Sequence, residues 1–276
     1  MKRWGLLALI CVLLAGCSAK FIYNKLDWLA VSYLDDFVEL NDEQESVVRN
    51  KVKALMKWHT GSELPHYIEH LDELIALNPQ TFSIEDLEAQ QKKIKIHSDR
   101  VLQKIEPEVV ELAKQLTDEQ VEELMNSIRV RHTRYKKKYK DLPPNEVQSI
   151  YAQKIEENFE EWFGPLTRDQ EAIVTEWSEH MLVTQPDWIK HQTKMRIVIN
   201  ELLNKRQDSS YFSNHLNQLL FNPNRYFSDP LLAKREHNQG ISARYFVKMV
   251  NSATPQQIQH YRNELEDWKD MALSLL

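Results

Sequence analysis

Glycine is unusually scarce in this chain, whose 276 residues include 5 glycines. Glycine adopts the positive φ angles of tight turns, and its bare backbone lets a phosphate loop approach a ligand closely. Average usage would be roughly 7% of residues. The scarcity argues against β-barrels, Rossmann folds, P-loops and nucleophile elbows, and it favours helices.

Apolar side chains recur at intervals of three and four residues, as on the buried face of a helix, whereas no stretch alternates as a strand would. The stripe over residues 21–40 predicts a first core helix, or a helix that lies against lipid. The polar, broken stretch 204–240 is expected to be a long loop or a partly ordered region. We predict an all-α, multi-helix bundle that breaks at six dipeptides ending in proline: Asn78-Pro79, Pro143-Pro144, Gly164-Pro165, Gln185-Pro186, Asn222-Pro223 and Asp229-Pro230.

Four helix starts share one capping pattern. A Thr or Asn side chain accepts from the amide three residues later, and the Gln at that position reaches back to the first amide. The spacing of the motifs suggests a fused duplication with halves 24–142 and 145–276. The four pairs are Asn41 with Gln44, Thr117 with Gln120, Thr167 with Gln170 and, more weakly, Thr254 with Gln257.

Residues 1–16 have the pattern of a secretory signal peptide, since two cations precede an apolar segment too short to span a bilayer. The segment ends Leu14-Ala15-Gly16-Cys17, which resembles a bacterial lipobox. The resemblance implies lipidation of Cys17, with residues 17–276 forming a periplasmic helical domain. Ser18 in place of Asp implies attachment to the outer membrane. The alternative is an ordinary cleaved signal with a chance cysteine.

Such processing would remove Cys11 and acylate Cys17, leaving no thiol for nucleophilic catalysis or metal binding. It would also remove two cations, so that 33 Lys and Arg remain against 41 Asp and Glu. A net charge of −8 does not suggest a nucleic-acid-binding protein. No glycine loop is available to hold a cofactor, and we predict that the protein has no cofactor.

Two resemblances to families follow from short motifs. The pattern Leu-Thr-x-x-Gln at 116–120 and 166–170 resembles the Spy/CpxP-like periplasmic chaperones and stress regulators. A fuller resemblance is to uncharacterised Gram-negative lipoproteins grouped as a family of unknown function, which implies lipid anchoring and no known activity. It rests on Cys17, residues 23–28, 34–38 and 40–44, Trp58-His59, and Glu63-Leu64-Pro65 with Tyr67.

The strongest local charge feature is the segment 129–140, which holds seven cations and no acid. One interpretation is a surface for anionic headgroups, an acidic glycan or an unfolded acidic client. The other is the C-terminal half of a helix whose first turns are acidic, a polarity that complements the helix dipole. Tyr135 and Tyr139 are expected in the core. The cations are Arg129, Arg131, Arg134, Lys136, Lys137, Lys138 and Lys140.

His66-Tyr67-Ile68-Glu69-His70 has the H-x-x-E-H spacing of inverted zinc proteases. Helical geometry places His66 and Glu69 opposite the apolar stripe of this segment and His70 on its flank. We therefore expect all three side chains to be solvated. A metal-dependent hydrolase or metal-binding sensor that uses His66, Glu69 and His70 is the alternative function.

The sequence predicts a lipid-anchored helical binding protein of the cell envelope. We expect it to be non-enzymatic, with a chaperone-like or stress-related function. Its partners would be the membrane, through the lipid, and a protein or unfolded client. A further alternative is a structural lipoprotein that docks one envelope partner. The sequence does not indicate the partner or the oligomeric state.

Overall fold

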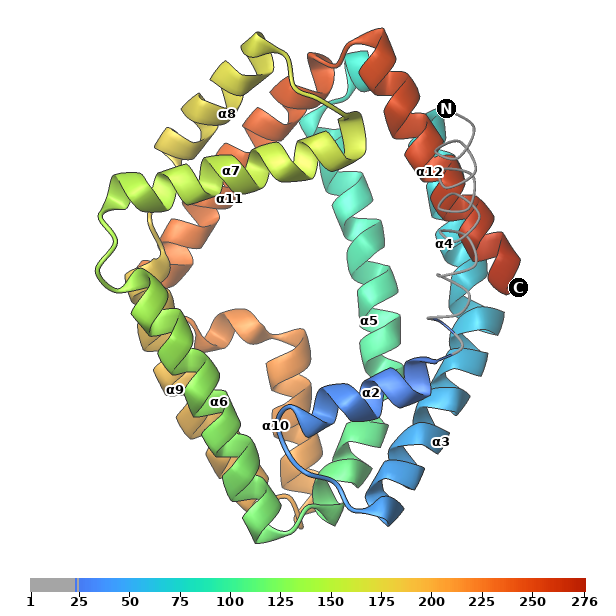
Figure 1. The fold of residues 1–276 in the computed structure, drawn as a ribbon, viewed down its shortest axis with the longest axis vertical. Coiled ribbons are helices and arrows are strands. Elements are labelled where there is room, and N and C mark those ends of the chain that lie inside the picture. Colours follow the sequence, from blue (N-terminus) through green and yellow to red (C-terminus); the bar gives the residue numbers. More distant parts are fainter. Residues whose placement is uncertain (1–22, 24) are drawn as a thin grey trace, which may run out of the picture. The chain divides into compact units, whose positions relative to one another are not determined.

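The computed structural model describes residue 23 and residues 25–276. All regular elements in this part of the chain are helical (Figure 1), which confirms the predicted all-α fold. None of the helices within these residues is long and apolar enough to cross a bilayer. The predicted signal peptide 1–16 and Cys17 lie outside the described residues, so the lipid anchor stays a prediction.

Contacts between residues divide the chain into two compact units. The first combines the described part of Met1–Ile75 with Leu265–Leu276, and the second is Ala76–Glu264. These limits differ from the halves 24–142 and 145–276 that the capping motifs suggest. The duplication itself stays a prediction.

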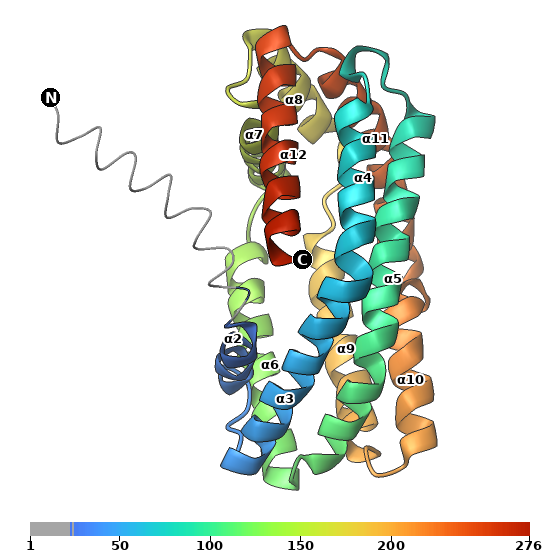
Figure 2. The ribbon, with the colours of Figure 1, turned by 90° about the vertical axis from the view of Figure 1, so that its right-hand side faces the viewer.

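The first unit contains α2 (Leu26–Asp35), α3 (Asp42–Trp58) and α4 (Leu64–Ala76), with a π-helical turn at His59–Glu63 that joins α3 to α4. It also contains the C-terminal part of α12 (Pro255–Leu275), which lies beside α4 (Figure 2). Lys269 of α12 forms an ion pair of 2.6 Å with Asp72 of α4.

The helix expected over residues 21–40 is shorter in the structure and only partly buried. Val31 of α2 is 2% exposed, but Trp28 and Tyr33 on the same helix are 54% and 62% exposed. The apolar stripe therefore marks a helix correctly and overstates its burial, because ten residues present only a narrow face to α3.

The second unit has two hydrophobic cores connected by the long helix α5. Leu87 near the start of α5 belongs to one core, with Phe159, Trp177 and Met249, and Val110 near its end belongs to the other, with Phe212. The helices of this unit are α5 (Ile84–Gln115), α6 (Asp118–Tyr139), α7 (Pro144–Phe163), α8 (Arg168–His180), α9 (Gln185–Asn204), α10 (Ser209–Phe221), α11 (Asp229–Asn251) and the first part of α12, with 3₁₀ turns at Pro79–Thr81 (η2) and Pro223–Tyr226 (η3).

The expectation of a long loop over 204–240 is wrong. The segment forms α10 and the first half of α11, separated by the short turn η3. Asp208 caps α10 by accepting a hydrogen bond of 3.0 Å from the amide of Tyr211. Phe212 and Leu231 are 2% and 0% exposed. A few deeply buried side chains and a cap hold a segment whose overall composition is polar.

All four capping motifs form reciprocal hydrogen bonds at helix N-termini. A fifth box, Ser83 with Asp86, starts α5 and was not expected. Two of the boxes also join each other. The amides of Gln170 and Gln257 exchange two hydrogen bonds of 2.9 Å, and both side chains are buried. The starts of α8 and α12 are thereby held together.

Candidate functional site: a basic face on α6 and a polar cleft beside α11

The seven cations of segment 129–140 are all exposed, six of them on α6 and Lys140 at its C-cap. This exposed set is called the basic face below. The Tyr139 side chain of the same helix points into the second unit and is 9% exposed. Tyr135 is half-buried, and burial raises its pKa to about 12. The two tyrosines pack together with ring centroids 4.6 Å apart. They occupy the core side of α6, so the basic face presents charge and not stacking rings.

A groove of about 490 Å³ runs between α6 and α9 at the start of the basic face. Arg129 and Glu122 line it from α6 and Arg196 from α9, together with Met125, Ile197 and two asparagines. Ile197 is 67% exposed and gives the groove an accessible apolar surface. Successive turns of α6 place Lys136 on the same side of the helix as Arg129. The groove thus combines two arginines and one glutamate with apolar groups.

Arg206 fixes the helix pair that forms this groove. Its Nε donates to the carbonyl of Leu116 at 3.0 Å, and its guanidinium pairs with Asp118 at 2.6 Å. The Arg206 side chain is only 8% exposed, while Asp118 remains solvated. The contact joins the end of α9 to the start of α6, so the two helices run antiparallel with the groove between them.

A comparison with family models matches residues 36–230 to DUF6279, described as a family of unknown function. This chain belongs to DUF6279. The matched region contains the basic face and the groove between α6 and α9. Neither the search of curated proteins nor the search of solved structures gives a match.

In this DUF6279 protein the H-x-x-E-H residues do not assemble a metal centre. Nδ1 of His66 lies 3.7 Å from Glu69, and both side chains are exposed. No group of three or more potential metal ligands occurs among the described residues. His70 is 8% exposed, so the expectation that it would be solvated is wrong. The buried residues of α4 are Leu64, which lies on the apolar stripe, and His70, which lies on its flank.

The π turn before α4 gathers a partly buried polar cluster. The Tyr23 hydroxyl lies 3.1 Å from Nδ1 of His59 and 3.0 Å from the Thr60 hydroxyl. Burial lowers the pKa of His59, opposed by the charge of Glu63, which is 2% exposed. The His59 and Tyr67 rings meet edge to face at 5.3 Å. These motif residues therefore hold the first unit together around the π turn.

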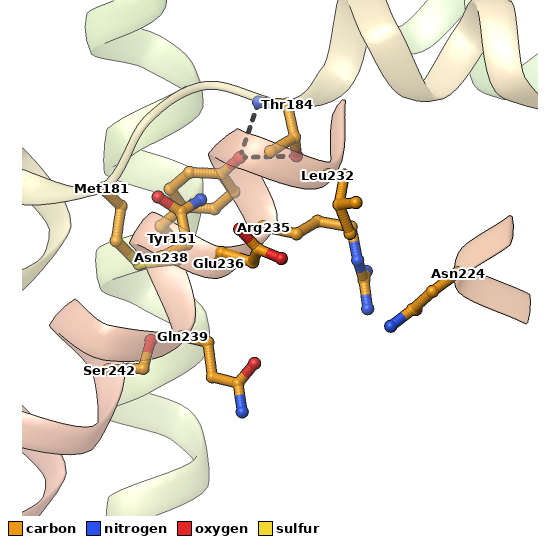
Figure 3. A pocket seen from close by; sticks show the side chains of 10 residues that line it. All are labelled: Tyr151, Met181, Thr184, Asn224, Leu232, Arg235, Glu236, Asn238, Gln239 and Ser242. Carbon is orange, nitrogen blue, oxygen red and sulfur yellow. Dashed lines mark hydrogen bonds between the residues drawn. The ribbon is translucent and has the colours of Figure 1, made fainter. Parts of the chain in front are cut away.

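A polar cleft of about 370 Å³ lies in the second unit (Figure 3). Tyr151 of α7, Thr184 of the α8–α9 linker, Asn224 of η3 and several residues of α11 line it. The sequence predicts none of them as site residues, because they come from four separate segments without a shared local motif. Only packing of α7 against α8 and of α8 against α11 brings them together.

Proposed function

We propose that this protein is a lipid-anchored binding protein of the periplasm that holds an acidic protein segment on the basic face of α6. The observation that supports this function is the exposure of all seven cations of segment 129–140 on one helix and its C-cap. Such a concentration of charge attracts an acidic partner and speeds its association. The rest of the mature chain is acidic, so the attraction is confined to this face.

The groove beside the basic face favours a protein segment over a lipid headgroup. A headgroup needs only cations, whereas Met125 and exposed Ile197 add apolar contact area between Arg129 and Arg196. An amphipathic acidic helix supplies both kinds of group, with carboxylates for the arginines and an apolar stripe for the isoleucine.

The proposed location rests on the lipobox-like sequence that ends at Cys17. Exposed Trp28 and Tyr33 on α2 follow this anchor closely in the chain, and such side chains are favoured at membrane interfaces. The Leu-Thr-x-x-Gln motifs that begin α6 and α8 agree with a Spy/CpxP-like role in binding unfolded clients.

Charge reversal on the groove side of α6 tests the binding function. We expect Arg129→Glu, Lys136→Glu and Lys140→Glu together to weaken binding of a labelled Glu/Leu amphipathic peptide about tenfold, since three exposed ion pairs contribute roughly 0.2–1 kcal/mol each. Fluorescence anisotropy at two salt concentrations measures the affinity, and the parent protein should show the steeper salt dependence.

The matched control reverses three exposed cations on other helices: Lys92→Glu, Lys154→Glu and Arg168→Glu. This variant has the same net charge and should bind as the parent does. Equal weakening in both variants would mean that net charge alone acts and would contradict a specific site. Binding to anionic vesicles with no binding to the peptide would instead identify the face as a membrane contact.

A further inference from the structure

The polar cleft has a wall whose backbone is already held in place. Each carbonyl from residue 179 to residue 183 accepts a hydrogen bond from a side chain of α7 or α11. A wall fixed in this way loses little conformational entropy when a ligand binds. The donors are Gln148 to Glu179 at 3.0 Å and to Met181 at 3.2 Å, His237 to His180 at 3.1 Å, Asn238 to Leu182 at 2.8 Å, and Lys234 to Val183 at 3.0 Å.

Arg235 lines the cleft with its guanidinium stacked on aromatic rings. The guanidinium carbon lies 4.7 Å from the centre of the Phe227 ring and 6.0 Å from that of Trp188. It forms no hydrogen bond or ion pair with any residue that the structure describes. Stacking positions the planar group and leaves its N–H donors at the edge, where they fit a carboxylate in bidentate geometry.

His191 packs against the same two rings, 4.8 Å from Phe227 and 5.0 Å from Trp188. Burial lowers its pKa, and the charges of Lys194 and Arg235 lower it further, against a hydrogen bond with the backbone of Tyr226. His191 is therefore neutral near pH 7. Arg235 is the cation that this aromatic cluster presents to the cleft.

Three more polar side chains in the cleft are without hydrogen-bond or ion-pair partners in the described part of the chain: Asn224, Glu236 and Gln239. Figure 3 shows the ends of Arg235 and Asn224 turned toward each other, with Glu236 and Gln239 facing the same open space. Arg235 and Glu236 are successive residues of one helix, so they point about 100° apart. The cleft thus offers opposite charges at two places, with amides beside them.

We infer that this cleft binds a small zwitterion, either a free amino acid or a short peptide. Arg235 pairs with the carboxylate of the ligand and Glu236 with its ammonium group. The side-chain amides of Asn224 and Gln239 form hydrogen bonds with the polar groups that lie between these two ends of the ligand. The volume of about 370 Å³ is at the small end of the range of about 300–1,000 Å³ for ligand sites, which suits a ligand of this size.

Isothermal titration calorimetry of the purified protein tests the site with four probes: alanine, alanyl-alanine, N-acetyl-alanyl-alanine and alanyl-alanine amide. A zwitterion should bind about fivefold more tightly than either blocked dipeptide, since each blocked form loses one pair with an exposed charge, worth up to roughly 1 kcal/mol. Equal binding of alanine and alanyl-alanine identifies an amino-acid site, and binding of the dipeptide alone identifies a peptide site.

Two variants separate the two charges. Arg235→Ala should weaken the binding of alanyl-alanine and of the N-acetyl form about fivefold and leave binding of the amide form unchanged. Glu236→Gln should weaken binding of the amide form and spare that of the N-acetyl form. Such opposite patterns do not arise from misfolding. Arg244→Ala, an exposed arginine on the same helix outside the cleft, is the matched control. Absence of binding by every probe, or unchanged affinity in Arg235→Ala, would overturn the inference.

Discussion

At the scale of single residues, the described glycines differ in what they do. Gly164 follows α7 with φ of 77° and ψ of −170°, a conformation that only glycine adopts readily. Gly61 lies in the π turn and Gly240 in the middle of α11, and neither has a positive φ. Only one of the three therefore requires the conformational freedom of glycine.

Alanine substitutions at Gly164 and Gly240 should change stability in opposite directions. Gly164→Ala is expected to destabilise by about 1–3 kcal/mol through backbone strain. The added Cβ would meet His260 at an ordinary 3.7 Å, so no clash contributes. Gly240→Ala has open space at its Cβ and should stabilise by about 0.5–1 kcal/mol, because alanine is the better helix former. Urea denaturation followed by circular dichroism measures both, and equal signs would contradict this assignment.

At the scale of the helices, the capping boxes do more than start them. Gln170 and Gln257 bond to the first amides of their own boxes and to each other. Gln257 also donates to the carbonyl of Pro165 at 2.9 Å, and Gln170 lies 3.3 Å from that of Ser252. Buried amides satisfied in this way specify how α8 and α12 meet.

A double-mutant cycle should detect the interaction free energy between Gln170 and Gln257. Gln170→Met and Gln257→Met each remove one cap and leave the other buried amide short of a partner, so each should destabilise by about 1–3 kcal/mol. The double variant should lose about 1 kcal/mol less than the sum of the two. Thermal unfolding supplies the free energies.

Ser83→Ala is the control for that cycle, since it removes a cap at the start of α5 without breaking a contact between boxes. It should cost about 0.5–2 kcal/mol and add independently to either glutamine variant. Strict additivity of the two glutamine substitutions would show that the pair contributes nothing beyond capping.

At the scale of the whole molecule, charge and burial make stability depend on pH. His132 and His191 each have a buried Nδ1 that lacks a hydrogen-bond partner within the described residues. Burial lowers the pKa of both below the ordinary 6.5, and the charge of Arg196 lowers that of His132 further. In the unfolded chain both would protonate at the ordinary pKa, so the unfolded state binds more protons in mild acid.

Stability should therefore be constant above the unfolded pKa of 6.5 and fall as the pH decreases from there toward the lowered pKa values. Melting temperatures measured across this range should show the decrease. His132→Gln with His191→Gln should flatten the profile, whereas His66→Gln at an exposed position should leave it unchanged. An unaltered profile in the double variant would exclude these two histidines as its cause.

Local sequence patterns predicted where helices form better than they predicted which side chains are buried. The acidic start and basic end of α6 predicted a helix, and the structure places it at Asp118–Tyr139. Patterns were less informative about burial, because burial depends on distant segments. Tyr33 lies on the predicted apolar stripe and is 62% exposed, whereas His70 was expected in solvent and is buried. The polar segment 204–240 is helical because it packs on neighbouring helices.

By itself the sequence determined the all-α class, the helix starts, the positions of the basic residues and the resemblance of residues 14–17 to a lipobox, since periodicity, capping and charge are properties of neighbouring residues. Only the tertiary structure decided that the boxes of α8 and α12 join, that α6 and α9 enclose a groove, and that Arg235 stacks beside a polar cleft. These features combine residues 51 to 90 positions apart, whose proximity arises from packing of whole helices and not from any local pattern.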